Sequence, residues 1–412
     1  MSEANRAGRE FVALALRLRR LVPELVEVVT ADRVVRRAVA AEPVPTAAEL
    51  VQRAGRLAAE LPDCGLDPGR ERFLAGQLRA VEWRARRLAG QRVPFSVEVE
   101  ACLDVAPVPG EPDEYRAAHR ELAALLPGSA PLRERLAARR TSDAVDPDRL
   151  GAVVGALTAG LRARVAPRYG LPPSEAVSHR IVDDGPWSAL HTYSGLGRSV
   201  VRINAGARPT AGRLPRLLAH ETYPGHHVEC IRAELAAVRG HAERAVTVAG
   251  SPWSVLSEGL AECALDTVVG TGWGPWSEQV LKTAGVDTDG RLAERVDVAL
   301  AALRRVRLDA ALLLHGGGRP TTDGVEAARA HLRRWLLLDD HRAHRVVDAL
   351  ARPLWRTQVV ASVEGSALVR AWLSRAGVDP VAEHLGLLDA PVVPSALRGR
   401  TSTEGCLIYD GR

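Results

Sequence analysis

Apolar residues recur at helical spacing along much of the first 165 residues. Proline and glycine interrupt this pattern at Pro62, at Pro68-Gly69 and between Pro107 and Pro112. Three stripes carry it: Leu14, Leu18, Leu21, Leu25 and Val28, which Pro23 can kink; Leu50, Val51, Leu57 and Leu61; and Leu74, Leu78, Val81 and Leu88. The pattern predicts an N-terminal lobe of packed helices over residues 1–170, ending near Leu171-Pro172-Pro173.

The hydrophobic pattern changes between residues 176 and 206. Residues 199–204 alternate like a β-strand and include β-branched side chains, with glycines at positions 195, 197 and 206 around them. This segment predicts a small β element beside the helix that follows it. Two roles are open: an edge strand that pairs with an extended substrate, or a structural strand in a mainly helical protein.

A further helical stripe, made of Leu214, Leu217 and Leu218, leads directly into His220-Glu221. We therefore expect His220 and Glu221 on an amphipathic helix. Imidazole is a favoured zinc ligand, and a glutamate beside it can act as general base on metal-bound water. The pair predicts a zinc site, with His220 as ligand and Glu221 as base.

A proline-glycine pair interrupts this helix where the common H-E-x-x-H motif has its second ligand. Pro224 lacks an N–H group and clashes with the carbonyl of His220, whereas Gly225 permits a bend. A kink can return His226 to the metal. Without one, His227 lies about 10.5 Å further along the same face. The sequence leaves both ligands open, and a capped, solvated helix end is the simpler alternative.

Two acidic residues further along the chain share one helical face. Glu258 and Glu262 are four residues apart in an apolar segment that begins near Ser254 or Ser257. Burying two carboxylates on such a face is costly unless they are paired or bind a cation. We expect one of them to be the third metal ligand, and a solvated acidic face is the alternative.

These residues together resemble the DUF885 family, a zincin-like group with the signature H-E-x-x-P-G-H-H. His220–His227 matches that signature, and Ser257–Glu262 resembles the family's later S-E-G-x-A-x-E element. Further matches are Pro186-Trp187, Tyr193–Gly195, Val201–Asn204, Arg304–His315, Gln358 and Gly365. The resemblance covers roughly residues 170–370. It implies a mainly α, large multi-helix zincin-like (gluzincin-related) fold, with a metal-binding lobe over residues 171–400.

The resemblance also implies roles for individual residues. Glu258 fits the family element and is expected as the third ligand, with Glu262 hydrogen-bonding a ligand histidine from behind. Asp309 is expected to support the site in the same way. His315 is either catalytic or a structural histidine that the dipole of its helix end favours. Three residues are candidates for polarising a substrate carbonyl: Tyr193, Tyr223 and His315.

One position departs from the family pattern. Ser362 stands where the family's C-terminal element has a tyrosine, and Glu364 lies close to it in sequence. If that tyrosine donates a hydrogen bond to the oxyanion, this chain lacks the donor. The departure puts ordinary peptidase activity in question.

Composition excludes several classes of protein. The net charge of +5 comes with arginines spread among acidic residues, so we expect no nucleic-acid partner. Five scattered cysteines in a 412-residue chain indicate a reducing compartment, and no segment is apolar enough to span a membrane. We expect a cytoplasmic protein without a membrane partner, with residues 401–412 as a loosely held tail. Nothing in the sequence indicates its oligomeric state.

The sequence therefore favours a zinc metallohydrolase that cleaves an amide or peptide bond in a small peptide or amino-acid conjugate. In this interpretation His220, His226 or His227, and Glu258 hold Zn²⁺, and Glu221 is the general base. One alternative keeps the metal but makes the protein a lyase, or another enzyme, acting on an amino-acid-derived metabolite. A second is a non-catalytic protein, whose structural metal would have four protein ligands.

Overall fold

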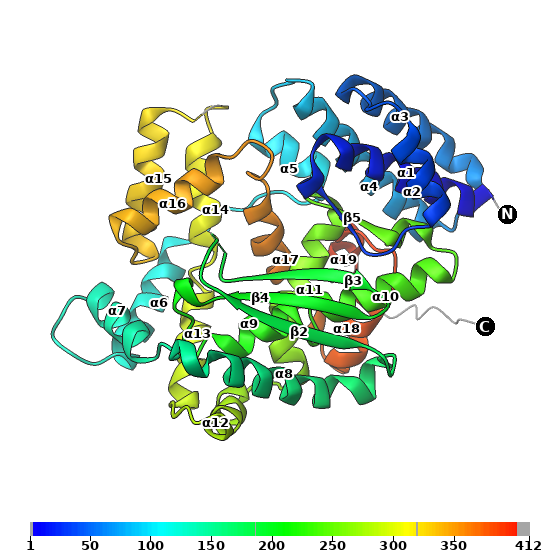
Figure 1. Cartoon of the computed structure of the whole chain (residues 1–412). Helices are drawn as coiled ribbons and strands as arrows, with labels where there is room; N and C mark the ends of the chain where they lie inside the picture. Colours follow the sequence, from blue (N-terminus) through cyan, green and yellow to red (C-terminus); the bar gives the residue numbers. More distant parts are fainter. Residues whose placement is uncertain (1–2, 186, 319, 402–412) are drawn as a thin grey trace.

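The computed structural model describes residues 3–185, 187–318 and 320–401 (Figure 1). Pro186, which belongs to the family resemblance, and residues 402–412 of the predicted tail lie outside the described residues. Helices make up 67% of the chain and strands 7%. The fold is therefore mainly α, as the hydrophobic periodicity predicts.

The first helices pack into one core at the N-terminal side of the molecule (Figure 1). The first predicted stripe continues past its helix, because α1 ends at Leu21 and Val22 is extended ahead of Pro23. The chain then forms β1 (Val26–Val28), which pairs antiparallel with β5 (Val246–Val248). The helices of this region are α1 (Glu3–Leu21), α2 (Arg33–Ala41), α3 (Ala47–Glu60) and α4 (Pro68–Leu88).

More helices surround the centre of the molecule, and their cores combine residues from both sides of residue 170. Tyr115, for example, shares a core with Leu314, and Val153 shares another with Leu388. None of the described helices is both long and apolar enough to cross a membrane. The helices are α5 (Phe95–Leu103), α6 (Pro112–Leu125), α7 (Leu132–Ser142), α8 (Pro147–Tyr169), α12 (Trp273–Thr283), α13 (Gly290–Ala301), α14 (Arg305–His315), α15 (Thr322–Trp335), α16 (Asp340–Ala351), α18 (Pro380–Asp389) and α19 (Pro394–Thr401).

A three-stranded sheet lies beside the central helices (Figure 1). Its strands are β2 (Ala176–Val182), β3 (Ala189–Gly195) and β4 (Arg198–Asn204), in the order β2-β4-β3. The strand predicted from the sequence is β4, which pairs parallel with β2 and antiparallel with β3. Because both sides of β4 are paired, it has no free edge for a substrate and its role is structural. The edge strand that packs against α9 and α10 is β3.

The predicted metal ligands and the predicted general base lie on α9 (Leu214–Glu221), α10 (His226–Val238) and α11 (Pro252–Val268), and α17 (Gln358–Leu373) packs against α11. Helices α11 and α17 touch through their backbones where Gly259 faces Gly365. A Cβ atom added to Gly259 would lie 2.3 Å from the carbonyl oxygen of Gly365. Two glycines therefore allow α17 to lie directly against the helix that carries Glu258 and Glu262.

Candidate metal centre

The chain reverses direction between α9 and α10, and this break determines which histidine returns to His220. The Gly225 N–H donates to the carbonyl of Ala219 at 3.0 Å. A Cβ atom at Gly225 would lie 1.9 Å from the carbonyl oxygen of His220, so only glycine fits here. The turn brings His226 Nε2 to 3.1 Å from His220 Nε2, with the two rings nearly perpendicular. The structure thus adopts the kinked alternative.

Glu258 approaches the two histidines from α11. One of its carboxylate oxygens lies 4.0 Å from His220 Nε2, and the other accepts a hydrogen bond from Gln358 at 3.3 Å. His220, His226 and Glu258 each offer a ligand atom, and these atoms lie within 4.8 Å of one another. All three side chains are largely but not fully shielded from solvent.

Both histidines have a carboxylate behind them. His226 Nδ1–H donates to Glu229 at 3.0 Å, and Glu229 also accepts hydrogen bonds from Trp253 Nε1 and Ser257 Oγ, both at 2.7 Å. Glu262 lies 3.8 Å from His220 Nδ1 and pairs with Arg304. The hydrogen bond to Glu229 fixes the tautomer of His226, so this ring directs Nε2 at the common centre, while Glu262 lies on the Nδ1 side of His220.

Burial and neighbouring charges shift the pKa values of these groups. Burial holds the pKa of His220 well below its usual range. Burial also lowers the pKa of His226, but the hydrogen bond to Glu229 and the negative charges of Glu229, Glu258 and Glu221 together outweigh burial and raise this pKa to about 10. Burial raises the pKa of Glu258. It raises the pKa of Glu221 to about 7, with His226 opposing and Glu258 adding to the shift.

The arrangement fits a zinc ion. Two histidine nitrogens bound to tetrahedral zinc at about 2.0–2.1 Å lie about 3.3 Å apart, close to the 3.1 Å between the Nε2 atoms. Two nitrogens and a carboxylate oxygen are donors that zinc accepts. The competing arrangement is a protonated His226 that donates Nε2–H to a neutral His220.

Glu221 ends α9 and is predominantly buried beside these ligands. Among the described residues its carboxylate has no hydrogen-bond partner. His226, Glu258 and Glu262 are close enough to influence its charge. A carboxylate with a pKa of about 7 and no internal partner is available to take and return protons near neutral pH.

His227, the other candidate ligand, lies in a different network. The ring is fully buried, with Nδ1 at 2.8 Å from Ser199 Oγ and Nε2 at 2.9 Å from Glu175. Tyr223 also donates to Glu175, at 2.6 Å. The polar atoms of His227 and Tyr223 are therefore engaged away from the His220–His226 pair.

Three further residues from the sequence analysis are engaged elsewhere. Tyr193 donates to Glu234, and His315 stacks on Phe95 with Nε2 at 2.9 Å from the carbonyl of Leu350. Asp309 accepts from Tyr115 at 2.6 Å. The structure does not join His315 or Asp309 to the His220–His226–Glu258 group. Glu364, two residues after Ser362, pairs with Arg305.

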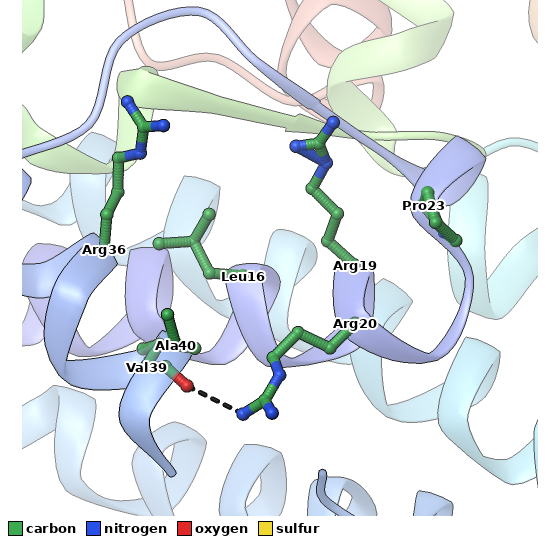
Figure 2. A pocket seen from close by; sticks show the side chains of 7 residues that line it. All are labelled: Leu16, Arg19, Arg20, Pro23, Arg36, Val39 and Ala40. Atoms are coloured by element: carbon green, nitrogen blue, oxygen red, sulfur yellow. Dashed lines mark hydrogen bonds between the residues drawn. The ribbon is translucent and has the colours of Figure 1, made fainter.

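Residues of β1 and β3 line a cavity of about 620 Å³, and one of them, His191, has its ring centroid 6.1 Å from that of His226. Glu27, His191 and Tyr193 line it, together with Arg33 and Arg36. A neighbouring cavity of about 320 Å³ shares Leu16, Arg19 and Arg36 with it. Figure 2 shows the guanidinium groups of Arg19 and Arg36 extending to the same side, whereas Arg20 turns to the carbonyl of Val39. The larger cavity therefore has acidic and histidine side chains together with a basic rim.

Sequence reasoning missed several residues around this centre. Glu229 is three residues after His226, a helical spacing that could have suggested it. Glu175 and Glu27 had no such local signal, because they come from distant segments. For His191 and Cys230 the only signal in the sequence was that histidine and cysteine are residue types that bind metals.

Comparison with known proteins supports the fold alone. No protein-family model and no curated protein sequence matches the chain. A solved structure from Colwellia psychrerythraea, titled "putative lipoprotein", matches with a TM-score of 0.51 and 17% identity, over 87% of this chain and 66% of that one. A second solved structure, from Shewanella oneidensis and titled a "putative lipoprotein of unknown function", matches with a TM-score of 0.51 and 12% identity, over 90% of this chain and 76% of that one.

Proposed function

We propose that this protein is a zinc-dependent hydrolase that cleaves an amide or peptide bond of a small peptide or amino-acid conjugate. The observation that carries the proposal is the pair of Nε2 atoms, 3.1 Å apart, each on a ring backed by a carboxylate. A hydrogen bond between the two histidines would explain the short distance, but it does not explain why the Glu258 carboxylate lies beside the same two nitrogen atoms. A shared metal ion accounts for all three side chains.

The proposal includes kinship with the DUF885 family and its zincin-like fold. Motif residues that are far apart in sequence lie together in space, which supports this. Gly225 permits the turn that brings His226 to His220, and Gly259 of the S-E-G element contacts Gly365 of the C-terminal element. Gln358, from that same C-terminal element, hydrogen-bonds Glu258. The matched positions thus all help to place His220, His226 and Glu258 around one point.

His220, His226 and Glu258 would hold the zinc ion. Bound zinc acidifies water and polarises carbonyl oxygens. Glu221 removes a proton from the attacking water and returns it to the leaving amine, a task that suits its pKa of about 7. Three protein ligands leave a position for substrate or water, whereas a structural zinc site uses four. The three-residue set therefore favours an enzyme over a structural metal site.

The cavity beside β3 supports an acidic substrate. Among the described residues, Arg19, Arg33 and Arg36 form no ion pair with an acidic side chain, although they line the cavity wall. A guanidinium binds a carboxylate through two parallel hydrogen bonds. A small peptide or conjugate with a free carboxylate suits this wall, and the edge strand β3 offers backbone groups to an extended substrate.

Zinc content and hydrolysis test the proposal together. The purified protein should hold zinc at the His220 centre, and His220→Ala should remove that zinc. Glu221→Gln should keep the zinc but lower hydrolysis by about 10²–10⁴-fold. The substrates are dipeptides and N-acyl amino acids, each with a free and an amidated carboxyl end. His344→Ala, at an exposed position, is the control for loss of a histidine.

The outcomes separate the alternatives. Retention of all zinc by His220→Ala would remove the proposed centre, and loss of zinc in Glu221→Gln would make Glu221 a ligand. Bound zinc with no turnover on any substrate would favour a lyase or another enzyme acting on an amino-acid-derived metabolite.

A cytoplasmic location remains part of the proposal. The two structural neighbours are titled lipoproteins, a name that suggests a membrane anchor for those proteins. Fractionation of the native host tests the location of this protein.

A further inference from the structure

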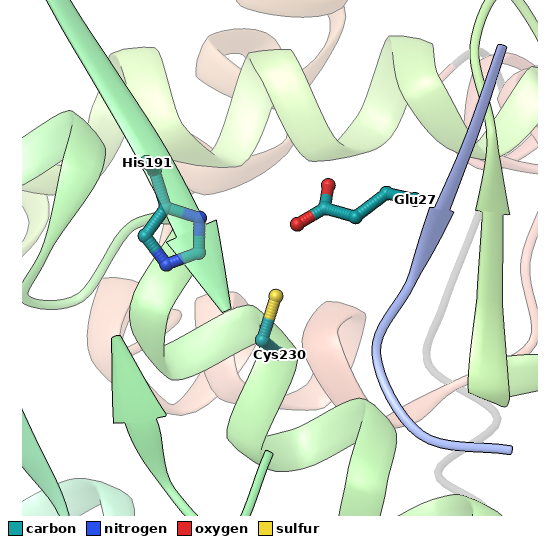
Figure 3. Close-up of side chains that lie close together, drawn as sticks. All are labelled: Glu27, His191 and Cys230. Atoms are coloured by element: carbon teal, nitrogen blue, oxygen red, sulfur yellow. The ribbon is translucent and has the colours of Figure 1, made fainter. Parts of the chain in front are cut away.

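A second set of metal-binding side chains lies beside the proposed zinc centre. Glu27, His191 and Cys230 come from β1, β3 and α10, and their ligand atoms lie within 4.8 Å of one another. Figure 3 shows the Glu27 carboxylate and the Cys230 thiol directed toward the space next to the His191 ring. Three residues from distant parts of the sequence therefore converge at one point.

A buried hydrogen-bond chain determines which nitrogen His191 presents. The Glu175 carboxylate accepts from His227 Nε2–H at 2.9 Å, which leaves His227 Nδ1 as an acceptor. Ser199 Oγ–H donates to that nitrogen at 2.8 Å, so Ser199 must in turn accept from His191 Nε2–H at 2.8 Å. His191 Nδ1 is consequently left with a lone pair, the form in which imidazole binds a metal.

The other two ligands are also held in place. Glu27 is the middle residue of β1 and pairs with Thr247 of β5 in the antiparallel ladder. Cys230 is predominantly buried and lies one helical turn after His226 on α10. The ring centroids of His191 and His226 are 6.1 Å apart. The second set is thus adjacent to the first but shares no residue with it.

We propose that Glu27, His191 and Cys230 form a second binding site for a divalent metal, with zinc as the preferred ion. Thiolate, imidazole and carboxylate are the three protein donors that zinc accepts. Cys230 binds as the thiolate and releases its proton to solvent. Glu27 and His191 line the large cavity, so a fourth ligand can reach the ion from there. This site does not depend on the proposed hydrolase activity.

Cobalt titration of the metal-free full-length chain tests the second site. Co²⁺ replaces Zn²⁺ in such sites and shows a near-ultraviolet charge-transfer band only when a thiolate binds it. We expect two equivalents of Co²⁺ to bind, with this band accompanying one of them. His220→Ala should lose the other equivalent and keep the band, which separates this site from the proposed zinc centre.

Three variants make the assignment specific. Cys230→Ala should abolish the band, whereas Cys102→Ala, at another buried free cysteine, should keep it. Glu27→Gln changes an exposed side chain, so folding should be preserved. The variant should weaken Co²⁺ binding at the band-forming site by at least about 10-fold. Losing a residue that only hydrogen-bonds a ligand already lowers metal affinity by about 10–100-fold, and Glu27 is proposed as a ligand itself. A wild-type protein with no thiolate band, a band that survives Cys230→Ala, or unchanged affinity in Glu27→Gln would overturn the proposal.

Discussion

His226 and His227 are neighbours in sequence, but their hydrogen-bond partners give them different roles. The His226 ring is backed by Glu229 and directs Nε2 at His220, whereas both nitrogens of His227 are used by Ser199 and Glu175. The available nitrogen depends on these partners, because a neutral imidazole has one donor and one acceptor nitrogen. The two residues cannot exchange places without breaking one of these networks.

Glu229→Gln tests this difference at the level of one residue. The carboxylate accepts from His226, Trp253 and Ser257, so either orientation of a glutamine amide would direct its NH₂ group at a donor. We expect zinc affinity at the His220–His226 centre to fall by about 10–100-fold. Competition with a zinc-binding chromophore measures it. Ser257→Ala removes one donor, leaves the tautomer unchanged and should have a smaller effect. Equal affinities for the two variants would contradict the assigned role of Glu229.

Helices α11 and α17 illustrate how two elements position a site. Their backbones meet at Gly259 and Gly365, and a Cβ atom on Gly365 would lie 2.0 Å from the carbonyl oxygen of Val255. The same two helices carry Glu258 and its hydrogen-bond partner Gln358. Any side chain at the contact would separate the helices and move Glu258 relative to His220.

Gly259→Ala should therefore destabilise the protein despite the higher helix propensity of alanine. We expect a loss of about 1–3 kcal/mol in the free energy of unfolding from overpacking, measured by urea denaturation, together with weaker zinc binding. Gly155→Ala is the matched control, because Gly155 lies inside α8 with no atom near an added Cβ. It should gain roughly 0.5–1 kcal/mol. Effects of the same sign for both variants would refute the close-contact explanation.

Buried polar contacts connect distant parts of the whole molecule. Glu98 of α5 is fully buried between Arg84 of α4 and Arg356, which precedes α17. His384 of α18 lies opposite the Tyr169 hydroxyl of α8 at 3.1 Å and the Leu260 carbonyl of α11 at 3.2 Å. These contacts are broken together when the molecule unfolds, so they belong to its global stability.

His384 makes the stability of the molecule sensitive to acid. Burial lowers its pKa to about 4, whereas an unfolded histidine has a pKa of about 6.5. Between these values the unfolded chain binds the extra proton, so stability falls as pH drops from about 6.5 to about 4 and the effect levels off below that. The group should contribute a loss of roughly 3 kcal/mol.

Urea denaturation at several pH values measures this contribution. His384→Gln should flatten the dependence on pH in that window. His341→Gln, at an exposed position, controls for the substitution itself. Identical slopes for wild type and His384→Gln would show that another group causes the acid sensitivity.

The sequence by itself determined the features that arise from local physics. Periodic leucines predict the helices, β-branched alternation predicts β4, and Pro224-Gly225 predicts the break after His220. It also identified His220, Glu258 and one of His226 and His227 as candidate ligands. It extended the first helix too far, since the apolar stripe continues through Leu25 and Val28 although the chain is extended before Pro23.

Only the tertiary structure decided which side chains share a point in space. The turn at Gly225 brings back His226 instead of His227 because Ser199 and Glu175, from other elements, hold the His227 ring. Glu27 meets His191 and Cys230 across more than 160 residues of sequence. Local periodicity contains no information about such contacts. They depend on the pairing of β1 with β5 and on the packing of β3 against α10.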